Sequence, residues 1–267
     1  MGSSGYLLSR DVRDVGCVSM PSNTLTGNNP QREQRVQSLM LDRLVLKYER
    51  RIMREIVRAM REGGRNQNDT SIMMTKHREN ITRLLVPLWN QSALAMSEHI
   101  VGPQKALSDV SPTTIQDTVV RNWINTYGAQ LITRITRTTQ DDIKRIISDG
   151  VRDGLTEREI TANVNAVASS VGSRRAQTIA RTETHAAANV SGHATAKAAG
   201  VRLEREWVAA SGDRTRRNHR DANGQRVGMN EAFTVGGVKL MYPSDTSVNA
   251  PSETINCRCA VAYVTIR

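Results

Sequence analysis

Two cysteines near the C-terminal end of the chain are separated by one arginine, in the segment Asn256-Cys257-Arg258-Cys259. In an extended strand, residues i and i+2 point to the same face, so both thiols can meet one metal ion while Arg258 points away. A disulfide between them is not expected, because their Cβ atoms would lie roughly 7 Å apart, against the ~4 Å of a bridge. Two thiolates supply half of a tetrahedral zinc site.

The other ligands of such a site could come from the segment that precedes these cysteines. His219 is the best candidate for the third ligand, and Asp213 or Asp245 could be the fourth. Alternatively, the two cysteines are small side chains that pack beside a strand, because structural zinc sites usually contain two Cys-x-x-Cys halves. The spacing leaves both interpretations open: structural zinc as a cofactor, or a metal-free core.

A second group of titratable residues lies within residues 180–185, Ala-Arg-Thr-Glu-Thr-His. On a helix, Arg181 and His185 share a face and Glu183 lies on another side. Glu183 and His185 could be the acid and base of an enzyme. We favour a structural motif, in which Arg181 and Glu183 fix the C-terminal unit to this helix through ion pairs. Asn256 and Arg258 are further structural residues of this motif. The sequence offers no activated nucleophile and no Gly-rich phosphate loop after a strand.

A stripe of arginines is predicted along the first long helix of the chain. It consists of Arg50, Arg54, Arg58, Arg61 and Arg65. Their spacing places them on one helix face, opposite an apolar face that includes Ile52 and Ile56. We expect Glu49, Glu55 and Glu62 to leave the stripe largely unneutralised. It could bind a phosphate backbone or an acidic protein surface, or it could be a solvated face.

The composition also points to an acidic partner. The chain has 267 residues, with 37 Lys+Arg against 26 Asp+Glu and a net charge of +11, and only six of the 37 are lysines. Arginine suits forked contacts to phosphate or carboxylate. Aromatic residues make up 3%, which argues against a protein that binds single-stranded nucleic acid by stacking bases on aromatic rings. Any contact with nucleic acid is therefore expected to be to backbone phosphate. Three cysteines are too few for a disulfide scaffold, and no apolar run reaches the ~18 residues of a membrane span, so no membrane partner is expected.

Hydrophobic periodicity predicts a mainly α protein with a small irregular α+β unit at the C-terminal end. Four regions are expected: an extended arm (1–30), a helical region (31–112), a second helical region (113–200) and a β-containing unit with the possible metal site (201–267). Expected helices cover 31–62, 72–100, 113–150, 157–169 and 173–199. Gly63-Gly64 should end the first, Pro87 should kink or split the second, and Thr156 with Glu159 forms a capping box. Short strands are expected at 201–209, 225–227 and 259–266.

An ordered series of motifs runs through the second half of the chain. It comprises the segment 179–184, then Trp207, Asp213, Arg216, His219, Asn223-Gly224-Gln225, Phe233, Tyr242-Pro243 and Asn256-Cys257-Arg258-Cys259. This series resembles the tailed-phage head-morphogenesis family, the Mu F-like minor head proteins, over roughly residues 120–267. Residues 1–110 match no family that we can name.

The resemblance implies a minor capsid protein inside the phage head, near the portal vertex, assembled in the cytoplasm of the bacterial host. Its implied partners are the portal protein, scaffolding or major capsid protein, and double-stranded DNA bound without sequence preference. The family is not known for enzymes, so no catalytic residues are expected. Its pattern pairs a histidine at the position of His219 with the two cysteines, which favours zinc. Some relatives carry a toxin or peptidase domain beyond this segment; with eight residues after Cys259, no fused effector is expected here.

Two other functions remain as alternatives. A metal-dependent DNA nuclease could use Asp213, His219 and the cysteines around an ion, although such sites favour oxygen ligands and an open position. A non-specific DNA-binding protein of the cell would also fit the charge. A sequence-specific regulator is not favoured, because no helix-turn-helix pattern stands out.

Overall fold

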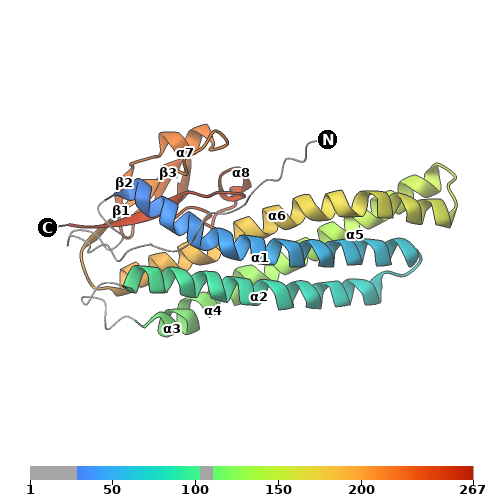
Figure 1. Cartoon of the computed structure of the whole chain (residues 1–267), viewed down its shortest axis with the longest axis horizontal. Coiled ribbons are helices and arrows are strands. Elements are labelled where there is room, and N and C mark those ends of the chain that lie inside the picture. The colour runs from blue at the N-terminus through green and yellow to red at the C-terminus, as the bar shows by residue number, and fades with distance from the viewer. Residues whose placement is uncertain (1–28, 103–110, 267) are drawn as a thin grey trace, which may run out of the picture.

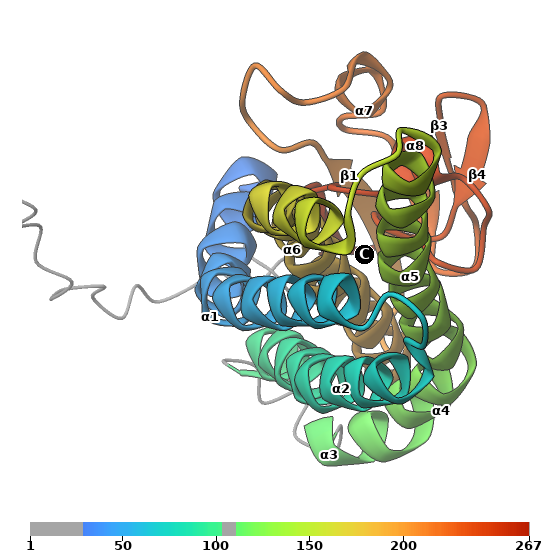
Figure 2. The same ribbon diagram turned by 90° about the vertical axis from the view of Figure 1, so that its right-hand side faces the viewer.

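Long helices lie side by side through most of the computed structural model, which describes residues 29–102 and 111–266 (Figure 1). They are α1 (Pro30–Arg65), α2 (Ser71–Val101), α5 (Ala129–Arg152) and α6 (Glu157–Ala198). Seen from the end of the bundle, α1, α2, α5 and α6 surround a common centre, and the C-terminal elements lie along one side (Figure 2). The expected mainly α fold with a small β-containing unit is confirmed. No helix in these two ranges is both long and apolar enough to cross a bilayer.

The starts of the helices follow local capping chemistry. The Asn29 side chain accepts a hydrogen bond from the Arg32 N–H at 3.1 Å, and Pro30 occupies the first turn of α1. At α6 the predicted capping box is present, with Thr156 and Glu159 each binding the other's backbone N–H. Of the expected arm at 1–30, residues 1–28 lie outside the described residues.

The predicted end of the first helix at Gly63-Gly64 is wrong, because α1 continues through both glycines to Arg65. These glycines are contact points between helices. A Cβ at Gly63 would lie 2.8 Å from Ile143 Cδ1 of α5, and one at Gly64 would lie 2.9 Å from Val164 Cβ of α6. The missing side chains let three helices approach, and that packing outweighs the low helix propensity of glycine.

The two helices expected at 157–169 and 173–199 are a single helix, α6. The helix is continuous across the gap expected at 170–172, where Gly172 faces α1: a Cβ there would lie 2.7 Å from Val57 Cγ2. After α6, Gly200 has a φ of +68°, which is the left-handed conformation expected just beyond a helix end.

Pro87 lies inside α2 and does not split it. Proline removes one backbone hydrogen bond at a cost of about 3 kcal/mol in a helix interior. Its neighbours Leu85, Leu88 and Trp89 are fully buried, and this packing keeps the helix continuous. Residues 103–110, which follow α2, are not described.

A continuous helical path leads from Ser111 into α5, as expected for 113–150. It passes through α3 (Pro112–Ile115), a π-helical turn η2 (Gln116–Val120), α4 (Arg121–Trp123) and a second π-helical turn η3 (Ile124–Gly128). The Ser111 side chain caps its start by accepting from the Thr114 N–H.

The C-terminal unit is built on a three-stranded antiparallel sheet in the order β2-β1-β5. Its strands are β1 (Leu203–Val208), β2 (Arg226–Gly228) and β5 (Ala260–Thr265), close to the predicted ranges. A hairpin of β3 (Phe233–Val235) and β4 (Val238–Leu240) was not predicted. Two short helices, α7 (Arg217–Asp221) and α8 (Pro251–Thr254), complete the unit.

Two apolar cores hold these parts together. One runs inside the bundle and includes Ile52, Leu85, Ile143 and Val164 from α1, α2, α5 and α6. The regions 31–112 and 113–200, which we expected as separate segments, thus share one core. The second core joins the bundle to the C-terminal unit: it packs helix residues such as Leu41, Met96 and Ile100 against β-unit residues such as Trp207, Phe233 and Tyr263.

Candidate functional site

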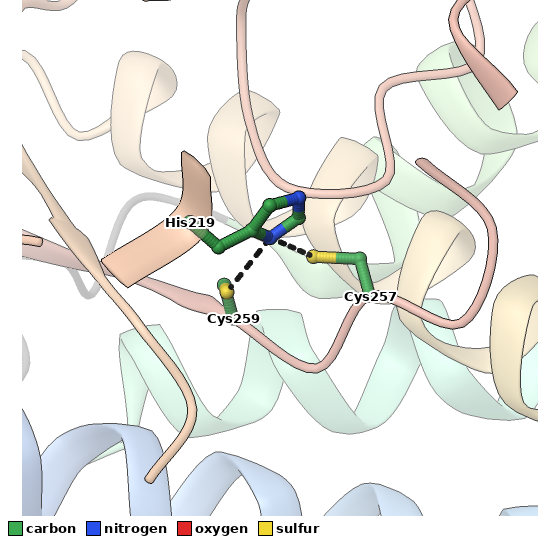
Figure 3. Close-up of side chains that lie close together, drawn as sticks. All are labelled: His219, Cys257 and Cys259. Atoms are coloured by element: carbon green, nitrogen blue, oxygen red, sulfur yellow. Dashed lines mark hydrogen bonds between the residues drawn. The ribbon is translucent and has the colours of Figure 1, made fainter. Parts of the chain in front are cut away.

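The predicted ligands His219, Cys257 and Cys259 meet in the C-terminal unit (Figure 3). His219 lies on α7, whereas the two cysteines follow α8 and precede β5. Asn256 has a φ of +58°, so the chain turns sharply immediately before Cys257. One nitrogen of the imidazole and both sulfur atoms lie within 4.8 Å of one another.

The geometry centres on one imidazole nitrogen. His219 Nδ1 lies 3.3 Å from Cys259 Sγ and 3.5 Å from Cys257 Sγ. The other ring nitrogen, Nε2, lies 3.0 Å from Glu253 Oε2. The residues His219, Cys257 and Cys259 are almost fully buried, at 1%, 2% and 3% exposure, so the cluster has no open face to solvent.

Proton sharing within the cluster favours charge on Cys257. The hydrogen bond from Cys259 is the main cause that holds the pKa of Cys257 below its usual value, whereas the same bond raises the pKa of Cys259. Burial acts to lower the pKa of His219, but its hydrogen bond and charge interaction with Cys257 raise it overall. These directions favour negative charge on Cys257 and positive charge on His219, with the proton of Cys259 retained.

The cluster also fits a zinc ion. In a tetrahedral site with Zn–S of about 2.3 Å and Zn–N of about 2.0–2.1 Å, neighbouring sulfur and nitrogen ligands lie roughly 3.6 Å apart. Both measured Nδ1–Sγ distances come within a few tenths of an ångström of that value. Glu253 adds the arrangement seen around metal-bound histidines, in which the second ring nitrogen donates to a carboxylate.

The two aspartates suggested as a fourth ligand do not join the cluster. Asp213 is exposed and stands outside the group of close metal-binding atoms among the described residues. Asp245 is fully buried, but its carboxylate accepts from the Met241 N–H at 2.8 Å and from the backbone and hydroxyl of Ser247. It stabilises the loop after β4. The described residues thus provide three ligands and one supporting carboxylate.

The expected link between α6 and the C-terminal unit exists but uses a different residue. Thr182 Oγ1 accepts a hydrogen bond from the Asn256 N–H at 3.0 Å, next to Cys257. Glu183 was expected to form an ion pair with the C-terminal unit; instead, it is buried in the bundle and accepts from Trp89 Nε1 at 3.1 Å and from the Tyr127 hydroxyl at 3.2 Å. Burial raises the pKa of Glu183 to about 7.

Arg181, His185 and Arg258 gather near this link without forming ion pairs to Glu183. Burial lowers the pKa of Arg181 and so does the nearby charge of Arg258. Burial also lowers the pKa of His185 to about 4, and its Nε2 atom has no hydrogen-bond partner among the described residues. The backbone carbonyl of Arg258 accepts from Gln34 Nε2 of α1 at 3.0 Å. The group connects α1, α6 and the cysteine segment.

A family model described as "Phage Mu protein F like protein" matches residues 141–262. Residues 141–262 are thus similar to the phage Mu F-like family. The matched range contains all of α6, the Thr182 link and all three members of the His/Cys cluster, and the resemblance drawn from the motifs is thereby confirmed.

A curated protein that is similar to this chain is NAD(+)--arginine ADP-ribosyltransferase EFV of Enterococcus faecalis. It is 30% identical over 132 residues, which cover 47% of this chain and 26% of that protein. The match thus spans about a quarter of the length of the relative. No solved structure matches the chain.

The predicted arginine stripe is exposed along α1, with one exception. Arg50, Arg54, Arg61 and Arg65 are exposed. Arg58 is not free: it forms a forked salt bridge to Glu55, with distances of 2.7 and 3.0 Å, and a second, very short one to Glu62. The expectation that the nearby glutamates leave the stripe unneutralised is therefore wrong at Arg58, where spacings of three and four residues along the helix bring these groups together.

Two important residues of the Mu F-like segment were missed from the sequence. Glu253 follows Pro251 in a short helix and is close to His219 only because of the turn before the cysteines. Arg205 on β1 is fully buried, and its guanidinium donates to the backbone carbonyls of Gly228, Glu231 and Met241 while lying against the Phe233 ring. Its only sequence signal was a charged residue at an inward position of an alternating strand.

Proposed function

We propose that this protein acts in phage head morphogenesis, as a minor capsid component inside the head near the portal vertex. The observation that carries this proposal is the Mu F-like match over residues 141–262, the same segment that brings His219, Cys257 and Cys259 together. In this role the protein is part of the virion and is assembled in the cytoplasm of the bacterial host. It works by binding partners, as a structural protein.

The portal protein is the proposed principal partner, with scaffolding or major capsid protein as further candidates. The purified full chain should be mixed with the portal protein of the same phage and analysed by size-exclusion chromatography at low and moderate salt. A stoichiometric complex that elutes ahead of both components is expected. Separate elution at both salt concentrations would contradict the proposed portal contact.

Contact with packaged double-stranded DNA is the second part of the proposal. A net charge of +11 and the exposed arginines favour binding to phosphates without base recognition. Fluorescence anisotropy with two unrelated duplexes of equal length should give equal affinities that fall steeply with salt. A preference of about 10³-fold for one sequence would point instead to a regulator.

We further propose that the His/Cys cluster holds a structural zinc ion through His219, Cys257 and Cys259. The donor set, the near-tetrahedral spacing and the Glu253 contact support this assignment. Bound zinc would cross-link α7 to the segment before β5. Metal analysis of the purified protein should find about one zinc per chain. A Cys259→Ser variant should lose the metal, whereas Asp213→Asn should keep it.

The nuclease alternative gains no support from the described residues. The cluster is buried and has thiolate ligands, whereas a nuclease ion needs oxygen ligands and an open position for phosphate. The transferase activity in the name of the Enterococcus relative belongs to a protein of which the match covers 26%. Incubation of duplex DNA with the protein and divalent ions is expected to leave the DNA intact.

A further inference from the structure

A groove of about 650 Å³ runs beside the second half of α1, where this helix lies along α6. α6 touches α1 closely at Gly172, against Val57, and again where the Thr161 hydroxyl donates to the Gly64 carbonyl at 2.8 Å. Between these two contacts, Ser169 of α6 lines the groove together with residues of α1. The hollow thus lies between α1 and α6.

The walls of the groove carry positive charge that the described residues leave unpaired. Arg54, Arg61 and Arg65 line the groove and form no salt bridge within 29–102 or 111–266. Arg61 makes one long hydrogen bond to Ser169, at 3.4 Å. Arg58 and Glu62 also line the groove, but they pair with each other, and Arg58 also pairs with Glu55. Arg54, Arg61 and Arg65 remain available for an acidic ligand.

The floor of the groove is apolar. It contains Met53 and Val57, which are partly buried and pack against the bundle core on their inner side. From residue 53 to residue 65 the helix rises about 18 Å, the length of five or six residues of extended peptide. An apolar side chain laid on Met53 and Val57 would gain from leaving water, whereas a phosphate would not.

We propose that this groove binds an acidic peptide segment of a partner protein, with apolar side chains on Met53 and Val57 and carboxylates on Arg54, Arg61 and Arg65. Planar guanidinium groups suit forked contacts to carboxylates. A DNA backbone would reach the arginines but leave the floor uncovered, and it would approach the Glu62 carboxylate. That the acidic segment belongs to the portal protein rests on the proposed function. The binding of an acidic and apolar peptide follows from the chemistry of the groove and does not depend on that function.

The test uses the full chain and fluorescein-labelled dodecapeptides. The probe alternates pairs of glutamate and leucine, and its matched control replaces every leucine by serine. Binding is measured by anisotropy for the wild type, for Arg61→Glu/Arg65→Glu, for Met53→Gln and for Lys76→Glu/Arg78→Glu. Lys76→Glu/Arg78→Glu changes the net charge by the same amount as Arg61→Glu/Arg65→Glu, but at exposed positions of α2. Circular dichroism confirms that every variant is folded.

The groove predicts that the leucine-containing peptide binds and that the serine control binds at least several-fold more weakly. Arg61→Glu/Arg65→Glu should lose about tenfold in affinity, because two favourable pairs become repulsive. Met53→Gln should lose a few-fold, and the α2 variant should stay within about twofold of the wild type. Equal binding of both peptides, equal loss in both charge variants, or no binding of the leucine-containing peptide would overturn the proposal.

Duplex DNA serves as the competitor that separates the two macromolecular classes. If a 20-base-pair duplex displaces the peptide and loses affinity mainly in Arg61→Glu/Arg65→Glu, the groove is a nucleic-acid surface and the proposal fails. Portal binding by the wild type tests the proposed function separately. If the wild type and Arg61→Glu/Arg65→Glu both elute with the portal protein, the proposed function stands and the groove is not the portal contact.

Discussion

The helical bundle and the C-terminal unit are stabilised in different ways. The bundle distributes its stability over many apolar contacts along α1, α2, α5 and α6, so no single contact dominates. In the C-terminal unit, β2, β3 and β4 have only three residues each, and a few polar side chains connect them. Arg205 and the His219 cluster bridge segments that are distant in the sequence. Substitutions should therefore have concentrated effects in the unit and graded effects in the bundle.

The largest effect is expected for Cys257→Ser with Cys259→Ser. If the wild type binds zinc, loss of both thiolates should destabilise the C-terminal unit by on the order of 5 kcal/mol. This is less than the zinc-binding free energy of ~10–16 kcal/mol in isolated zinc-finger peptides, because the second apolar core remains. Thermal unfolding and limited proteolysis of residues 200–267 would measure this. Asp213→Asn is the matched control and should behave as wild type. An unchanged melting curve in a protein that contains no metal would remove the zinc assignment.

Arg205→Met should have the next largest effect. It leaves the buried carbonyls around the guanidinium without a donor, at a cost of about 3 kcal/mol in unfolding free energy. Arg226→Met, which breaks the half-exposed pair with Glu206, should cost less than about 1 kcal/mol. Urea unfolding of both variants gives the comparison. Equal losses would show that burial of Arg205 is not what stabilises the unit.

Glu183 makes the stability of the bundle depend on pH. Its pKa is raised by burial from 4.5 to about 7, so the folded chain holds the proton more tightly than the unfolded chain. The contribution of Glu183 to the free energy of unfolding should be greatest below pH 4.5. It should fall by up to about 3 kcal/mol as the pH rises to about 7. Glu183→Gln should remove this slope and be more stable than wild type at pH 8. If the stability of the wild type and of Glu183→Gln changed with pH in the same way, the raised pKa of Glu183 would be contradicted.

Gly172→Ala tests the close helix contact in the bundle. Helix propensity alone would make alanine more stable by up to about 1 kcal/mol. The added Cβ would lie 2.7 Å from Val57 Cγ2, and we expect a net loss of about 1 kcal/mol from the overpacked contact. The double variant Gly172→Ala/Val57→Ala should recover part of that loss. A more stable single variant would mean that α1 and α6 separate easily here.

Much of the fold could be predicted because the periodicity of long helices is a local signal. The α1 and α2 ranges, the capping box of α6 and the three sheet strands follow from hydrophobic spacing and capping residues. The wrong helix ends at Gly63-Gly64 and near Gly172 share one cause. In both places glycine serves contact between helices that are distant in the sequence, which a local pattern does not reveal.

The candidate site was predictable only in part, for a related reason. Cys257 and Cys259 have a recognisable spacing, and His219 was singled out as the third ligand. Glu253 was missed because its contact with His219 depends on the turn at Asn256 and on the placement of α7. Ion pairing of Arg58 was misjudged because its partners, Glu55 and Glu62, were counted as charges of the helix and not placed on its surface.

Hydrogen exchange with and without a zinc chelator tests the contrast between the two regions most directly. Mass spectrometry would follow peptides from α1, α2 and α6 and peptides from α7 to β5 in the same sample. Chelation should remove protection from α7 and from the segment around Cys257 and Cys259, while the long helices keep theirs. Unchanged protection in the C-terminal unit, or equal loss of protection in both regions, would contradict this account. The account holds that metal stabilises the C-terminal unit, whereas the helical bundle is stable without it.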